Sequence, residues 1–317
     1  MSEGVRPAGT TTVSVVIETD SVHAYDDITL ADCLDAIMRQ GYPPELVEVV
    51  VVDGGKAPAV GARVTGQFPA ARVLTLPGGT KFEQKNLGAQ AATGEIVAFV
   101  DADCAPPPDW LATIVRALAQ APPGVAGVQG ITVLSAGWLA AEVSALFYGP
   151  RRRRDGPWAA RLVTDNCAFR RDVFRRFAFE HATFSTVVDT LFLLRLERAG
   201  YRLLVCEDLR MAHSFPGLAT RAGLGWFFGR AYGVGYYMVK ARQIEPDLRG
   251  SALVRGGVGW PLLALGKAVL DLRQVWENRR RLNARFLAAL PLLVPYEVTL
   301  FVGGLAALLG LRAPRWS

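Results

Sequence analysis

Four short runs of mostly β-branched residues occur in the first third of the chain, and each is followed by turn residues or by a helical pattern. The runs are residues 13–17, 47–52, 73–76 and 96–100. Because their apolar residues are continuous rather than alternating, the runs are typical of strands that are buried on both faces. Strands of this kind alternating with helices predict an α/β fold, in which a mainly parallel central sheet is flanked by helices.

Two of these predicted strands run directly into an aspartate, Asp53 after the second strand and Asp101 after the fourth. In parallel sheets covered by helices, ligands bind at the edge formed by the carboxyl ends of the strands. Asp101 and Asp103 are two residues apart, so both carboxylates point to the same side of an extended chain. Paired carboxylates suit Mg²⁺ or Mn²⁺, which keep open positions for phosphate oxygens. The alternative is a solvated loop with two turn-forming aspartates.

Composition and charge narrow the class of protein. Hydrophobic residues make up 51% of the chain, and the net charge of +6 suits a phosphate-bearing substrate or an anionic membrane surface. No nucleic-acid recognition motif accompanies that charge, so no nucleic-acid partner is expected. The four cysteines are scattered without a CxxC pair, which argues against a zinc site and favours reduced thiols in a cytosolic protein. The first residues show no signal-peptide pattern, so the catalytic body is expected in the cytosol.

Five sequence blocks resemble, in the same order, blocks of the family 2 glycosyltransferases, which have the GT-A fold. The blocks are VSVVIETDS (13–21), VEVVVVDGG (47–55), KFEQKNLGAQAATGEIVAFVDADC (81–104), LVTDNCAFRRDVF (162–174) and VVDTLFLLRLERAGYRLL (187–204). The resemblance extends over roughly residues 13–240. It implies an inverting, metal-dependent enzyme that moves a sugar from a nucleotide diphosphate, with UDP as the default nucleotide, to a hydroxyl acceptor.

The resemblance assigns donor binding to residues in three of these blocks. Thr19 lies in the nucleotide-contacting loop, and Asp53 is expected to accept a hydrogen bond from the base N–H of the donor. Lys85 and Asn86 occupy the place of a basic residue and an asparagine near the donor. From the residues alone two alternatives stay open, namely Asp53 as a helix N-cap or turn aspartate and Lys85 as a solvated helix residue.

The resemblance also implies which residues carry the chemistry. Asp101 is expected near the ribose or the metal. Asp103 is expected to bind the metal that bridges the diphosphate and neutralises charge on the leaving group. Asp189 is the candidate general base for the acceptor hydroxyl, and the alternative is a helix N-terminal aspartate favoured by the helix dipole. His213 is a candidate metal ligand, with a packed or surface histidine as the alternative.

Three positions depart from the family's pattern. Glu18 stands where the opening strand usually continues into proline, Gly54 where an acidic residue usually follows the base-binding aspartate, and Val188 where one usually precedes the catalytic base. The last two keep open a catalytically silent nucleotide-sugar-binding or scaffold homologue. A nucleotidyltransferase is disfavoured because no Gly-rich loop with Lys or Arg follows the first strand, and a dinucleotide-binding oxidoreductase because no GxGxxG does.

Two apolar stretches, residues 253–272 and 286–309, follow the predicted catalytic body. The sequence therefore predicts a GT-A glycosyltransferase domain at residues 1–245 and an apolar, arginine-containing helical tail at residues 246–317. If both stretches crossed a membrane, the arginines between them would lie outside, against the positive-inside tendency. We therefore expect a peripheral or C-terminally anchored tail at the cytoplasmic side of the cell membrane, with arginines against anionic headgroups. A lipid-linked acceptor suits this place. The alternative is ordinary packed helices of a soluble protein.

Overall fold

The computed structural model of the chain describes residues 10–23, 28–56, 60–135, 152–153, 155–180, 182, 184, 186–215, 217–248, 250–255, 259–278 and 290–312. Packing separates the chain into two compact units. Unit 1 comprises Met1–Val133, Gly149–Thr183 and Val188–Ser214, and unit 2 comprises Leu134–Tyr148, Phe184–Val187 and Phe215–Ser317. Each unit is described by itself.

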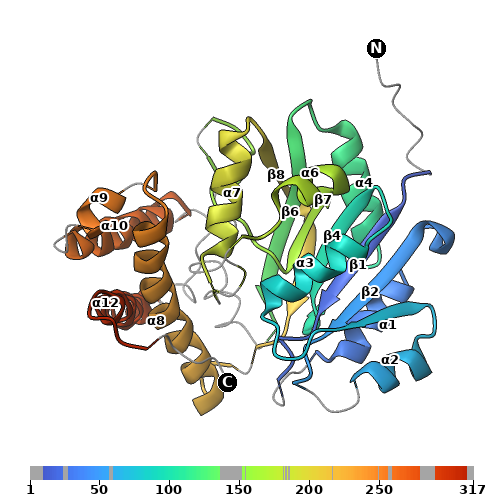
Figure 1. Ribbon diagram of the computed structural model, residues 1–317, viewed down its shortest axis with the longest axis horizontal. Helices are drawn as coiled ribbons and strands as arrows, with labels where there is room; N and C mark the ends of the chain where they lie inside the picture. Colours follow the sequence, from blue (N-terminus) through green and yellow to red (C-terminus); the bar gives the residue numbers. More distant parts are fainter. Residues whose placement is uncertain are drawn as a thin grey trace. The chain divides into compact units, whose positions relative to one another are not determined.

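The described strands form an eight-stranded sheet in the order β3-β2-β1-β4-β7-β6-β8-β5 (Figure 1). Their bounds are β1 Val13–Glu18, β2 Val47–Asp53, β3 Ala71–Thr75, β4 Ile96–Asp101, β5 Cys104–Ala105, β6 Val125–Leu134, β7 Asn166–Arg170 and β8 Arg202–His213. Strands β3, β2, β1 and β4 are parallel neighbours, whereas β7 runs antiparallel to β4 and to β6, and β5 antiparallel to β8. The predicted α/β fold with a central sheet flanked by helices is thus confirmed, and the parallel part of the sheet consists of β3, β2, β1 and β4.

Strand β6 is one uninterrupted strand although it contains Gly127 and Gly130. The two glycines of β6 do not form a turn. They allow the backbone of neighbouring strands to approach closely. A Cβ atom at Gly127 would lie 2.3 Å from the carbonyl oxygen of Ala168, and one at Gly130 would lie 2.0 Å from that of Leu209. Both distances are shorter than any side chain tolerates, so only glycine fits these positions.

The helices of unit 1 follow the predicted pattern of strand and helix. They are α1 Leu30–Met38, α2 Val60–Gln67, α3 Lys81–Ala91, α4 Trp110–Gln120, α6 Arg171–Phe177 and α7 Val188–Arg198, together with the 3-10 turn η1 Pro44–Leu46. Thr29 and Asp32 form a capping box at the start of α1, and Thr80 and Glu83 form another at the start of α3. Each box satisfies backbone N–H groups that have no partner within the helix.

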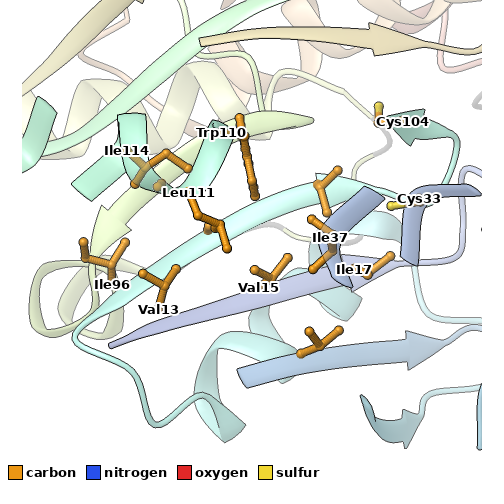
Figure 2. Close-up of a cluster of buried hydrophobic side chains, with 14 of the residues drawn as sticks. Val13, Val15, Ile17, Cys33, Ile37, Ile96, Cys104, Trp110, Leu111 and Ile114 are labelled. Carbon is orange, nitrogen blue, oxygen red and sulfur yellow. The ribbon is translucent and has the colours of Figure 1, made fainter. Parts of the chain in front are cut away.

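The continuous apolar strands are explained by packing on both faces of the sheet. On one face, Val13, Val15 and Ile17 of β1 pack with side chains of α1 and α4, including Trp110 and Ile114 (Figure 2). Helix α3 packs against β1 and β2. It buries Phe82, which contacts the ring of Phe179 edge-on. Since every residue of β1 and β4 is buried, neither strand could alternate with polar residues.

Unit 2 is helical where it is described. Its elements are α8 Arg221–Ile244, α9 Ser251–Arg255, α10 Trp260–Asn278, the 3-10 turn η4 Leu290–Leu292 and α12 Leu293–Leu308. Helices α8 and α12 approach closely, because a Cβ at Gly235 would lie 1.8 Å from the Leu300 carbonyl oxygen. The Trp260 indole N–H donates to the Phe301 carbonyl at 2.9 Å, which ties α10 to α12. The predicted boundary at residue 245 stays a prediction; by packing, α8 belongs with the C-terminal helices.

Candidate functional site

The carboxyl ends of β1, β2 and β4 meet at one edge of the sheet, because the three strands are parallel and adjacent. The strand register sets Glu18, the last residue of β1, between Val52 of β2 and Asp101 of β4. Asp53 ends β2 one residue later. The predicted grouping of strand-end carboxylates at one edge is therefore what the fold produces, and a glutamate stands in its middle.

Lys85 and Asp101 form a buried ion pair at this edge. The Lys85 side chain comes from α3, is fully buried, and donates from Nζ to Asp101 Oδ1. Burial raises the pKa of Asp101, but Lys85 outweighs it and holds this pKa at about 2. Burial lowers the pKa of Lys85, but the carboxylates of Asp101 and Glu18 together raise it above its usual value. Lys85 is therefore not the solvated helix residue of the open alternative.

Glu18 is a site residue for which the sequence predicted no role. The only signal was that it stands where the family's opening strand usually continues into proline. Its Oε2 accepts hydrogen bonds from the backbone N–H groups of Asp20, at 2.6 Å, and Ser21, at 3.2 Å. Its Oε1 is buried and has no hydrogen-bond partner among the described residues. Burial, reinforced by the charge of Asp101, raises the pKa of Glu18 to about 8. Glu18 therefore shapes the loop after β1, and its burial favours the neutral carboxyl.

Thr19 joins the ends of β1 and β2. Its backbone N–H donates to Gln84 Oε1 at 2.9 Å, and its Oγ1 donates to the Val52 carbonyl and accepts from the Gly54 N–H. A Cβ at Gly54 would lie 2.4 Å from Gln84 Nε2. The missing acidic side chain at Gly54 therefore has a packing reason. Thr19 is buried, so its side chain positions the loop.

Asp53 and Asn86 both make local contacts in the structure. Asp53 is partly exposed, and its Oδ1 accepts from the Gly55 N–H at 2.8 Å, as a turn aspartate does. Its other carboxylate oxygen is available to the predicted donor contact. The Asn86 amide donates to the Phe179 carbonyl and accepts from the Phe179 N–H, each at 2.9 Å. Asn86 thus holds the segment around Phe179, and direct donor contact by Asn86 stays a prediction.

Asp103 and His213 are brought together from distant parts of the sequence. Strand pairing sets Cys104 opposite His213, and the Ser214 N–H donates to the Asp103 carbonyl at 2.8 Å. The His213 Nε2 lies 3.7 Å from Asp103 Oδ2. The His213 Nδ1–H donates to the Ser214 carbonyl at 2.6 Å, since a carbonyl only accepts. This bond leaves Nε2 as the nitrogen available to a metal, as in many metal-binding histidines.

The side chains around Asp103 fit a hard divalent cation. Ligand atoms of Asp103, Cys104 and His213 lie within 4.8 Å of one another. Cys104, however, belongs to the hydrophobic core shown in Figure 2, and burial raises the pKa of its thiol well above the usual value. The ligands that remain are one carboxylate oxygen and one imidazole nitrogen. Such a set suits Mn²⁺ or Mg²⁺ and leaves coordination positions for phosphate oxygens.

Asp189 lies in the first turn of α7 and is partly exposed. Its Oδ1 accepts from the Thr190 N–H at 2.7 Å. The residue before the helix, Val187, has a φ of +64°, a region that β-branched residues rarely adopt and that is often found at functional sites. Val188 is fully buried, which explains why no acidic residue stands there. The predicted role of Asp189 as the base stays a prediction.

With this geometry established, comparisons with known proteins identify the family. The family model described as "Glycosyl transferase family 2" matches residues 27–177. The chain carries a family 2 glycosyltransferase domain. The matched segment contains the Lys85–Asp101 pair and Asp103, and it ends with helix α6. The predicted family is thereby confirmed.

Two curated relatives from Haloferax volcanii match shorter parts of this domain. "Glycosyltransferase AglE" is 32% identical over 84 residues, which are 25% of this chain and 27% of the relative. "Glucosyl-dolichyl phosphate glucuronosyltransferase" is 30% identical over 118 residues, which are 36% of each. The chain thus spans about a third or less of the length of these relatives.

Solved structures share the fold over most of the chain. The mannosyltransferase PcManGT from Pyrobaculum calidifontis, in complex with GDP-Man and Mn²⁺, superposes with a TM-score of 0.59 at 20% identity. The superposition covers 94% of this chain and 87% of that one. GalNAc-T7 with UDP, GalNAc and Mn²⁺ gives a TM-score of 0.52 at 15% identity, covering 78% and 53%. These likenesses confirm the predicted GT-A fold.

Proposed function

We propose that the protein is a metal-dependent, inverting glycosyltransferase that moves a sugar from a nucleotide diphosphate to a hydroxyl acceptor. The observation that carries this proposal is the pairing of Asp103 with His213 at the carboxyl edge of a family 2 domain. Of the solved neighbours, PcManGT is a complex with GDP-Man and Mn²⁺, and GalNAc-T7 is a complex with UDP, GalNAc and Mn²⁺. Both nucleotides are therefore candidates for the donor, although family prevalence alone suggested UDP.

Each residue has a defined task in this proposal. Asp103 and His213 would hold the cation, which supplies electrostatic stabilisation of the leaving nucleoside diphosphate when bound. The buried Lys85 keeps Asp101 ionised and fixed at the end of β4, beside the donor. Thr19 shapes the loop that faces the base, and Asp53 accepts from the base N–H. Asp189 accepts the proton of the acceptor hydroxyl as that oxygen attacks the anomeric carbon.

The transfer is tested with a panel of UDP- and GDP-sugars. Purified protein is expected to release nucleoside diphosphate from at least one donor when Mn²⁺ or Mg²⁺ is present, and to stop when EDTA is added. Asp189→Asn is expected to lower transfer about 10²- to 10⁴-fold, the usual contribution of a general base, while Mn²⁺ and nucleotide affinity stay within a few-fold. The measurement is product formation by coupled assay, with binding by calorimetry.

Two outcomes would contradict this prediction. Nucleotide binding without turnover on any donor and acceptor would favour the silent homologue. Full transfer by Asp189→Asn would remove this residue from the mechanism. Glu197→Gln is a matched control, because Glu197 is an acidic residue of the same helix and its partner is Arg153 on the protein surface.

We further propose that unit 2 attaches the protein to a membrane surface, where a lipid-linked acceptor would lie. Among the described residues one helical stretch, Leu290–Leu308, is long and apolar enough to cross a membrane, a test that buried core helices also pass. Exposed aliphatic side chains form one stripe on each of two helices, Leu262, Leu265, Val269 and Leu272 on α10 and Val294, Val298, Val302, Leu305 and Leu309 on α12. Spacings of three and four residues put each stripe on one face of its helix.

Three charged residues of these helices, Lys267, Asp271 and Glu297, are largely buried and lie together. Lys267 donates to Asp271 at 2.5 Å and to Glu297 at 2.8 Å, which links α10 to α12. Apolar side chains outside and paired charges inside are the arrangement expected of helices against lipid. Of the arginines between the two apolar stretches, Arg273 is exposed on α10, and Arg279, Arg280, Arg281 and Arg285 lie outside the described residues. The name of one relative, a dolichyl phosphate glycosyltransferase, supports a lipid-linked acceptor.

Flotation with anionic phospholipid vesicles tests the attachment. The full chain is expected to float, and the double variant Leu265→Glu/Val298→Glu to lose about tenfold or more in membrane partitioning, because two exposed aliphatic contacts with lipid are replaced by charges. Met38→Glu, at an exposed apolar position of α1, is the control and should float like the wild type. Equal flotation of the double variant would refute attachment through these stripes.

A further inference from the structure

An acidic residue that neither the sequence prediction nor the proposed mechanism uses lies at the same sheet edge. Asp165 immediately precedes β7, which pairs antiparallel with β4. The register aligns Val100 with Asn166, so one further residue along each strand brings Asp165 opposite Asp101. Antiparallel pairing thus brings the start of β7 to the edge where β4 ends, at the level of Asp101 in the register.

The position of Asp165 is fixed by its buried neighbour Asn166. The Asn166 Nδ2 donates to the Leu209 carbonyl at 2.9 Å and to the Ile131 carbonyl at 3.3 Å. Its Oδ1 accepts from the Trp110 indole N–H at 2.8 Å. One amide therefore ties the start of β7 to β6, β8 and α4. A carboxylate attached to such a rigid segment is held in place without contacts of its own.

Asp165 stands at the edge of the sheet that carries the metal-binding residues. The register that pairs Val100 with Asn166 continues towards Asp101, two residues before Asp103. Asp165 is partly exposed, and no described residue gives it a hydrogen bond or an ion pair. Its oxygens are thus available to a ligand.

The metal centre can accommodate a further carboxylate beyond its direct ligands. Asp103 and His213 supply two protein ligands of the right kind, and the compact ligand group does not include Asp165. Mn²⁺ and Mg²⁺ take about six ligands and keep several waters when the protein supplies few. Carboxylates beyond the ligands hold such waters by hydrogen bonds and raise the affinity for the metal.

We propose that Asp165 is an outer-shell carboxylate of this metal centre, which accepts a hydrogen bond from a metal-bound water and so positions that water beside Asp103 and His213. The inference rests on the metal site of the proposed function, and it assigns to Asp165 a positioning role rather than direct ligation. Its negative charge also adds to the attraction for the cation.

Mn²⁺ titration of the full chain, followed by the electron paramagnetic resonance signal of free Mn²⁺, tests the proposal without any sugar donor. Asp165→Asn keeps the shape of the side chain and is expected to raise the Kd for Mn²⁺ about tenfold, at the lower end of the effects of outer-shell residues. Asp165→Glu is expected to recover part of the affinity. Asp208→Asn makes the same change at an exposed position of β8 and should leave the Kd within about twofold. Thermal unfolding checks that each variant is folded, and Asp165→Ser replaces the asparagine variant if that one is not.

Three results would overturn the proposal. Asp165→Asn could bind Mn²⁺ like the wild type, or it could lose binding as fully as Asp103→Asn, which would make Asp165 a direct ligand. The wild type could also fail to bind Mn²⁺. A failure of glycosyl transfer is distinguishable, because tenfold weaker Mn²⁺ binding by Asp165→Asn without turnover on any donor would support the inference and refute the proposed function alone.

Discussion

Replacing Lys85 by methionine is expected to lower the free energy of unfolding by about 3–5 kcal/mol, the usual effect of leaving a buried charge without its partner. The side chain of Lys85 is fully buried against Asp101, which is itself buried, and Glu18 lies next to both. Methionine fills similar space but removes the cation, so the Asp101 carboxylate is left in a poorly solvated place. Denaturation with urea at neutral pH measures the loss.

Two control variants distinguish the effect of losing the buried charge from the effect of any substitution in α3. Lys81→Met changes a partly exposed lysine at the start of the same helix and should cost less than about 1 kcal/mol. The double variant Lys85→Met/Asp101→Asn should regain part of the stability, because the unpaired charge is gone. Equal losses in Lys81→Met and Lys85→Met would contradict the importance of the pair.

The pH dependence of this effect has a definite sign. Lys85 holds the pKa of Asp101 at about 2, below the ordinary 3.8, so the ionised Asp101 stabilises the wild type above that window. This stabilisation is lost as the pH falls through about 2. The Lys85→Met variant lacks it throughout. The difference in stability between the two proteins should therefore narrow as the pH is lowered from 3.8 towards 2.

Asp103→Asn is expected to abolish measurable Mn²⁺ binding and to lower donor turnover by about 10²-fold or more. Asparagine has the same size, but its neutral amide is a poor ligand beside the single imidazole of His213. A bound metal would stabilise the leaving diphosphate by several kcal/mol, and each 1.4 kcal/mol corresponds to a tenfold change in rate. Turnover of the best donor and Mn²⁺ titration measure both effects.

The same Asp208→Asn variant serves as the control for Asp103→Asn, since it removes a charge from an exposed position of β8. Thermal stability should be unchanged or higher in Asp103→Asn, because the carboxylate stands among other buried acidic groups. Turnover that keeps its full rate and its dependence on Mn²⁺ in Asp103→Asn would show that the metal binds elsewhere.

Two departures from the family's pattern could be seen in the sequence but not explained by it. At Gly54 and Val188 the sequence showed missing acidic residues and therefore left a silent homologue open. The structure supplies local reasons for both, since a side chain at Gly54 would collide with Gln84 and Val188 is fully buried. Neither reason can be obtained from the sequence, because Gln84 belongs to a helix that reaches Gly54 only in the folded chain.

The sequence alone predicts the four parallel strands, their alternation with helices and the edge at which Asp53 and Asp101 stand. Hydrophobic period and capping are local properties, so continuous β-branched runs and boxes such as Thr29 with Asp32 are visible in a single chain. Only the folded chain shows that Lys85 is buried against Asp101, that Asn86 holds Phe179, and that β7 begins at the level where β4 ends. Those contacts depend on which strands pair and in which register, and this choice is made by packing between segments far apart in the chain.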